Sequence, residues 1–124
     1  MRPLAAPQPG QCFCRKPETG VGFAPFNQRR AGWGKDGPPT ITWCCDDCVP
    51  YAKTVHHMKR DTFNVIERDS LLAAGNAAGG YLDRIGKTDL AALSAEEWEI
   101  FLGTPLDQFG VELRTRLEQH QPPF

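Results

Sequence analysis

The segment Thr40-Ile-Thr-Trp-Cys-Cys-Asp-Asp-Cys48, read together with Cys12-Phe-Cys14, decides how the first half of this chain folds. The 124-residue sequence contains five cysteines, and all of them lie in these two segments. Two closely spaced cysteine pairs, separated by a longer stretch of chain, are typical of a tetrahedral Zn²⁺ site to which each pair contributes two thiolates. The sequence therefore predicts one structural Zn²⁺ ion, which stabilises a loop-rich segment too small to fold on its own hydrophobic core.

The spacing leaves two choices for one of the four ligands. The expected ligands are Cys12, Cys14, Cys44 and Cys48. Cys44 is chosen because it would end a strand, which leaves Cys45 at the cap of the following helix. In the alternative, Cys45 replaces Cys44 and Cys45-x2-Cys48 has the more common two-residue gap. A third interpretation is that the five thiols are buried as small hydrophobic side chains.

The compartment that the sequence indicates favours a metal site. No apolar signal segment precedes Cys12, and no stretch approaches the roughly 18 apolar residues of a membrane span. We therefore expect an intracellular protein without membrane association. Thiols stay reduced in that compartment, so a metal site is favoured over a disulfide framework.

Two short strands and a helix are predicted around the cysteines. Val21–Phe26 and Thr40–Trp43 carry the aromatic and β-branched residues typical of strands, and the loop of residues 27–39 would form the tip of a hairpin. Asp46 and Asp47 suit the cap or first turn of a helix, where carboxylates are favoured. A knuckle, a hairpin and a helix that returns two ligands form a treble-clef-like arrangement.

The remainder of the chain is predicted to be helical. One helix is expected over residues 62–85, with Gly86 as its terminator. Ser94 and Glu97 have the spacing of a capping box, which predicts a second helix start. Gly103 would close that helix.

Thr104 and Pro105 would begin another helix, which ends near His120. The predicted fold class is therefore small α+β, with a zinc-stabilised knuckle and β-hairpin followed by three to four α-helices. Residues 1–60 would form a treble-clef-like zinc-binding module, and residues 61–124 a helical region packed on it.

Charge is distributed unevenly between the two halves. Residues 1–60 contain nine Lys or Arg against four Asp or Glu, whereas residues 61–124 contain five against eleven. The basic hairpin tip could contact phosphates and stack on bases. Its candidate residues are Arg29, Arg30, Trp33 and Lys35. The acidic half would repel nucleic acid and suits a basic protein partner. Its candidate partner-binding residues are Glu96, Glu99, Asp107 and Glu112.

The chain also resembles a family of small uncharacterised proteins encoded in bacteriophages, prophages and related mobile elements. The resemblance rests on Cys-x-Cys-Arg, a following Gly-Phe, an aromatic-Cys-x-x-x-Cys knuckle, and Gly-Gly-Tyr-Leu-Asp-Arg-Ile-Gly-Lys-Thr-Asp-Leu-Ala-Ala-Leu-Ser-Ala-Glu-Glu-Trp-Glu at residues 79–99. It departs from the family in the tighter Cys12-x-Cys14 gap and in Cys45, where a small polar residue is usual. The resemblance implies a mobile-element origin, and hence the cytoplasm of a bacterial host cell.

Three functions are compatible with these patterns. The favoured one is a non-enzymatic, zinc-structured interaction protein that binds a host or phage protein. The first alternative is a nucleic-acid-binding zinc finger that uses the basic hairpin tip. The second is a small treble-clef nuclease, for which His56 and His57 are the candidate catalytic groups. Adjacent histidines on a helix point about 100° apart, so we expect one to pack and the other to face solvent.

Overall fold

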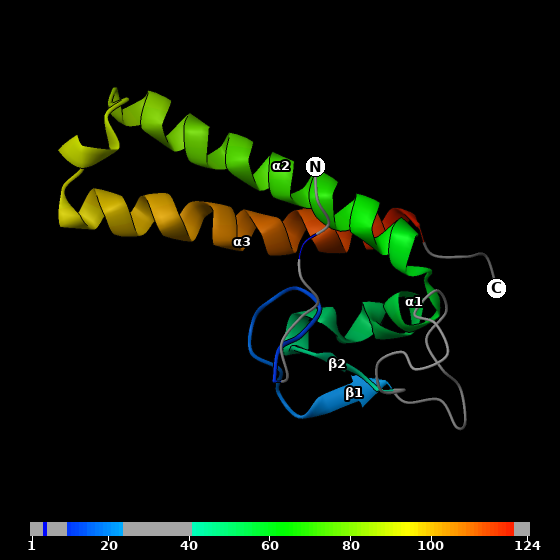
Figure 1. Ribbon diagram of the computed structural model, residues 1–124. Helices are drawn as coiled ribbons and strands as arrows, with labels where there is room; N and C mark the ends of the chain where they lie inside the picture. Colours follow the sequence, from blue (N-terminus) through cyan, green and yellow to red (C-terminus); the bar gives the residue numbers. More distant parts are fainter. Residues whose placement is uncertain (1–3, 5–9, 24–40, 121–124) are drawn as a thin grey trace.

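A long helical hairpin stands over a small two-stranded module in the computed structural model of this chain (Figure 1). The structure describes Leu4, residues 10–23 and residues 41–120. In chain order the elements are β1 (Val21–Phe23), β2 (Thr42–Cys44), the 3₁₀ helix η1 (Asp46–Tyr51), α1 (Ala52–His57), α2 (Arg60–Ile85), the 3₁₀ helix η2 (Leu90–Ala92) and α3 (Ala95–Gln119). The described part is thus a small, mostly helical α+β fold, in agreement with the predicted class.

The two strands pair antiparallel, as the hairpin prediction requires. Val21 lies opposite Cys44, Gly22 opposite Trp43 and Phe23 opposite Thr42. A Cβ on Gly22 would approach Ile41 Cγ2 to 2.8 Å, so a larger residue here would require the Ile41 side chain to shift. The predicted tip of the hairpin and its basic candidate residues lie outside the described residues.

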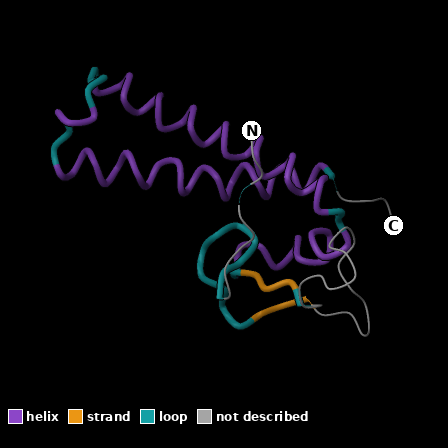
Figure 2. The backbone as a smooth tube through the Cα atoms, viewed as in Figure 1, coloured by secondary structure: helices purple, strands orange, loops and turns teal. Residues whose placement is uncertain are grey.

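Two long helices form the helical hairpin, by which we mean α2, α3 and their connection (Figure 2). Helix α2 begins at Arg60, two residues before the predicted start, and ends where Gly86 adopts a left-handed φ of 69°. The Lys87 N–H then donates to the Leu82 carbonyl at 3.2 Å, which completes a Schellman motif. The prediction that Gly86 ends this helix is therefore confirmed. No helix in the described part of the chain is long and apolar enough to cross a membrane.

Helix α3 begins as predicted but continues further. Ser94 and Glu97 form the capping box, with both reciprocal hydrogen bonds present. The prediction that Gly103 ends this helix and that Pro105 begins another is wrong, because α3 is continuous over Ala95–Gln119. The Thr104 hydroxyl donates to the Ile100 carbonyl at 2.7 Å inside the helix. Packing of α3 against α2 outweighs the local preference for a break.

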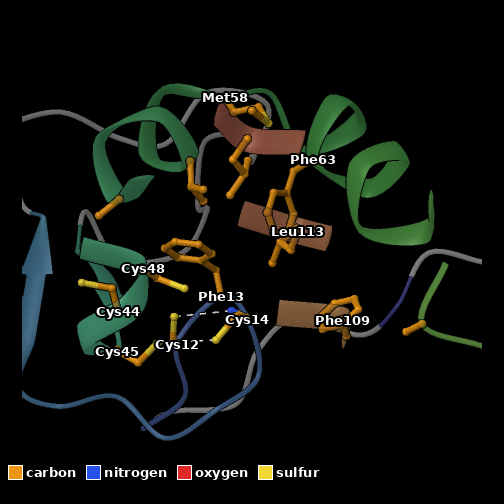
Figure 3. Close-up of a cluster of buried hydrophobic side chains, with 14 residues drawn as sticks. Cys12, Phe13, Cys14, Cys44, Cys45, Cys48, Met58, Phe63, Phe109 and Leu113 are labelled. Carbon is orange, nitrogen blue, oxygen red and sulfur yellow. Dashed lines mark hydrogen bonds between the residues drawn. The ribbon is translucent and has the colours of Figure 1, made fainter. Parts of the chain in front are cut away.

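One buried core joins the cysteine-containing module to the helical hairpin (Figure 3). The ring of Phe13 packs edge-on against Phe63 of α2, with 6.5 Å between the ring centroids. Helix α3 contributes Phe109, Leu113 and Leu117, all of which are buried. The two predicted regions therefore share their hydrophobic interior.

A candidate metal centre

The first cysteine pair lies on a tight turn that we call the knuckle, residues 10–18. The Cys12 N–H donates to the Lys16 carbonyl at 2.8 Å, and the Arg15 N–H donates to the Cys12 carbonyl at 2.9 Å. The Cys14 N–H points at Cys12 Sγ from 3.4 Å. Arg15 closes the turn with a left-handed φ of 77°. These backbone bonds direct the Cys12 and Cys14 thiols to the same side of the turn.

The second pair lies at the start of η1. Cys45 is the N-cap of this helix, with extended backbone angles, and the Cys48 N–H donates to the Cys45 carbonyl at 3.0 Å. A single helical turn therefore separates the two residues, which brings their side chains to one face. This is how a two-residue gap presents two ligands to one ion.

The two pairs converge on one point. The Sγ atoms of Cys12, Cys14, Cys45 and Cys48 all lie within 4.8 Å of one another, and all four residues are buried. Cys14 Sγ and Cys45 Sγ are 3.6 Å apart. A tetrahedral ion with Zn–S bonds of about 2.3 Å places its sulfurs about 3.8 Å apart. The cluster therefore has the composition and dimensions that could hold such an ion.

The fourth sulfur of the cluster belongs to Cys45, which was the alternative ligand, and not to Cys44. Cys44 is the last residue of β2, and its Sγ donates to the Val21 carbonyl at 3.3 Å. Its thiol therefore points toward β1 and away from the other four sulfurs (Figure 3). Burial raises the pKa of the Cys44 thiol, which suits a protonated donor. Because successive side chains alternate along extended chain, Cys45 faces the cluster instead.

The clustered thiols perturb one another's ionisation. Hydrogen bonds from Cys12 and from Cys48 lower the pKa of Cys14. The same network raises the pKa of Cys12, through Cys14, and raises the pKa of Cys48, through Cys12 and Cys14. The thiols of Cys12, Cys14 and Cys48 therefore do not ionise independently, because a thiolate at one of them opposes a second negative charge within 4.8 Å. A divalent cation would remove that repulsion, because thiolates are its ligands.

Two arginines connect this cluster to the helical hairpin. Arg114 of α3 places Nη1 3.7 Å from Cys48 Sγ, where a positive charge offsets the negative charge of thiolates. Arg15 of the knuckle donates from Nη2 and Nε to Glu67 Oε2 of α2, at 2.8 Å and 3.2 Å. The Glu67 side chain is only 1% exposed. These three residues were not anticipated, since 52 and 66 sequence positions separate the partners of the two contacts.

The two adjacent histidines of α1 differ in burial. His56 is buried, its Nδ1 is 2.9 Å from Thr42 Oγ1, and its ring packs edge-on against Phe23 at 5.2 Å between centroids. His57 is exposed. The expectation that one histidine packs and the other faces solvent is confirmed.

The predicted partner-binding carboxylates divide into two groups. Glu96, Glu99 and Asp107 are exposed, and Asp107 lies 3.9 Å from Lys16 Nζ of the knuckle. Glu112 is half-buried and binds Gln108 and Arg116 along its own helix. Arg29, Arg30, Trp33 and Lys35 lie outside the described residues.

Comparison of the chain with protein-family models, with curated proteins and with solved structures gives no significant match.

Proposed function

We propose that this chain is a non-enzymatic, zinc-structured interaction protein of phage or mobile-element origin, and that it binds a protein partner through its helical hairpin. One structural Zn²⁺ ion would be bound by Cys12, Cys14, Cys45 and Cys48. The observation that carries the proposal is the convergence of these four buried sulfurs within 4.8 Å.

The ligand set favours a structural ion over a catalytic one. A catalytic zinc keeps a position open for water or substrate, whereas four thiolates fill a tetrahedron. The cluster also lies against the shared core, since Phe13 between the two knuckle cysteines packs on Phe63. An ion there would fix the knuckle to η1 and both of them to the helices. That role is mechanical, because metal binding free energy becomes folding free energy.

An interaction role is supported by the apolar side chains that the helical hairpin exposes. Trp98, Leu102 and Leu106 of α3 are 43%, 51% and 53% exposed. Scattered apolar residues are common on protein surfaces, but these three follow one another at helical spacing along one helix. Figure 1 shows that the part of α3 nearest its N-terminus extends beyond the two-stranded module. A partner can therefore reach it.

Metal analysis of matched cysteine variants tests the zinc site. The purified protein should contain one Zn²⁺ per chain by mass spectrometry of the metal. Cys45→Ser should lose it and expose the remaining thiols to a chromogenic thiol reagent. Cys44→Ser, a neighbouring and equally buried substitution, should keep it. Retention of zinc by Cys45→Ser and loss by Cys44→Ser would show that the ligand set is wrong, and no zinc in any sample would remove the proposed site.

Capture experiments test the choice of partner. The tagged protein should retain its partner from a bacterial lysate after nuclease treatment. Complete loss of captured material after that treatment would instead support the nucleic-acid alternative, which stays a prediction because the basic hairpin tip lies outside the described residues.

A further inference from the structure

An apolar groove runs between the two long helices on the side that faces the knuckle. Leu71 of α2 and Pro105, Leu106 and Phe109 of α3 line an open pocket of about 390 Å³, to which Arg15 of the knuckle and Leu4 also contribute. Gly75 lies one helical turn beyond Leu71, and a Cβ added there would meet nothing within 4 Å. We use the term groove for this pocket together with Leu102, which lies one turn before Leu106 on the same face of α3.

Within the described residues, the groove continues the apolar face of α3 beyond the buried core. Leu102, Leu106, Phe109, Leu113 and Leu117 follow one another at three- and four-residue spacing, so they form one face of α3. Leu113 and Leu117 are fully buried beneath the cysteine-containing module. Leu102 and Leu106 are 51% and 53% exposed. The same apolar face is thus covered over its second half and exposed over its first.

One edge of the groove is acidic. Residues 95–108, the exposed half of α3, contain four Asp or Glu and no Lys or Arg, which gives a net charge of −4. Two of these carboxylates already face a lysine, since Glu97 pairs with Lys87 at 2.6 Å and Asp107 lies 3.9 Å from Lys16. Glu96 and Glu99 are exposed and lie within two turns of Leu102 along α3. An occupant must therefore combine an apolar stripe with positive charge.

We propose that the groove binds a basic amphipathic α-helix of a partner protein, with leucine-like side chains in the groove and Lys or Arg side chains against Glu96 and Glu99. This proposal rests on the proposed interaction function and specifies its partner. The exposed half of α3, residues 95–108, is about 21 Å long at 1.5 Å per residue. That length accommodates about four turns of a partner helix, which is the scale of helix-in-groove recognition.

Charge argues against a second copy of this chain as the occupant. Two helical hairpins packed through this face would bring two segments of net charge −4 together. Like charges across an interface oppose association, whereas a basic helix gains from the same field. The groove therefore discriminates by sign of charge as well as by shape.

The test uses two synthetic helical peptides and the full chain with zinc bound. Each peptide is about 18 residues, or five turns, with leucines at every third or fourth position. One carries lysines on both flanks of the leucine stripe, and the other carries glutamates at the same positions. Fluorescence anisotropy of the labelled peptides should show saturable binding of the lysine peptide. The glutamate peptide should bind at least about tenfold more weakly.

Matched variants locate the binding site. Leu102→Ala and Leu106→Ala should each weaken binding of the lysine peptide about tenfold, as expected of apolar side chains at the centre of an interface. Val111→Ala is the control, because Val111 is 49% exposed on the opposite face of the same helix. Glu99→Lys should weaken binding of the lysine peptide more than Asp83→Lys, which makes the same change of charge on α2 away from the groove.

Three results would overturn the proposal. Equal binding of both peptides would show that charge does not select the occupant. Unchanged affinity in both leucine variants would place binding elsewhere. Sedimentation of the unmodified chain as a dimer, reduced to a monomer by Leu106→Ala, would identify a second copy as the occupant. The zinc content of every sample is measured as well. If the peptides do not bind although each chain contains one zinc, the groove proposal is refuted and the proposed metal centre is not.

Discussion

The ion pair between Arg15 and Glu67 should contribute strongly to stability, and a double-mutant cycle can measure it. Glu67 is buried, with a 1% exposed side chain, while Arg15 is 23% exposed. No partner for the second carboxylate oxygen, Oε1, is present among the described residues. Removing one partner of a buried ion pair leaves the other charge uncompensated, which costs about 3–5 kcal/mol. Partial exposure of Arg15 places the expected effect near the lower end, about 3 kcal/mol.

The two single variants should differ because the two partners differ in burial. Arg15→Met leaves a carboxylate beneath the knuckle and should lower the free energy of unfolding by about 3 kcal/mol, or the melting temperature by about 12 °C for a chain of this size. Glu67→Gln keeps the shape and leaves an arginine that can reach water, so about 1 kcal/mol is expected. Arg15→Met with Glu67→Gln removes both charges and should be less destabilised than Arg15→Met alone.

Urea denaturation followed by circular dichroism, at a fixed excess of zinc, measures these differences. The matched control is Lys16→Met, the next residue of the knuckle, which pairs with the 80% exposed Asp107 across 3.9 Å. An exposed pair of this kind should contribute less than about 1 kcal/mol. If Arg15→Met destabilises no more than Lys16→Met, or if the two substitutions are additive in the cycle, the reasoning is refuted.

Two further predictions concern the helices. Gly103→Ala should raise the free energy of unfolding by about 0.8 kcal/mol, because α3 is continuous there and nothing lies within 4 Å of an added Cβ. Gly86→Ala should lower the free energy of unfolding by about 1 kcal/mol, because Gly86 has a left-handed φ of 69°. Thermal melts check both signs, and destabilisation by Gly103→Ala would indicate a helix end at that residue. Hydrogen bonds from Lys87 and from the Ser94 N–H lower the pKa of Glu97. The stabilising contribution of Glu97 is therefore present above its unfolded-state pKa, and it is lost as pH falls through the lower folded-state pKa. Carboxyl NMR titration should give a pKa for Glu97 below that of a reference peptide, and an equal value would contradict the capping geometry.

Local signals in the sequence predicted local structure well. The capping box at Ser94 and Glu97 and the terminator Gly86 involve residues a few positions apart, so their geometry is set by short-range hydrogen bonds. The antiparallel strand pair and the convergence of two cysteine pairs were predictable for a related reason. Ligand spacing fixes which side chains can meet around one ion.

Competing signals explain the two corrections. The Gly103 and Pro105 signals for a helix boundary are genuine, but they compete with packing of α3 along α2, which the sequence does not report. The choice between Cys44 and Cys45 as a ligand depends on where β2 ends. Neighbouring side chains of an extended segment point to opposite faces, so Cys44 points to β1 and Cys45 points to the cluster. The two-residue gap to Cys48 was the more informative signal.

The contacts that sequence reasoning missed explain why the metal centre and the groove belong to one folding unit. Arg15 follows the second cysteine of the knuckle, holds Glu67 of α2, and borders the pocket beside Leu106. An ion that fixes the Cys12–Cys14 turn therefore also fixes one end of the groove. Under the two proposals, zinc and a basic helix would stabilise the same arrangement of knuckle and helices, and linkage requires that each then strengthen binding of the other. Chelation should accordingly weaken the lysine peptide in the unmodified chain, and that dependence should diminish in Arg15→Met, where the connection is removed.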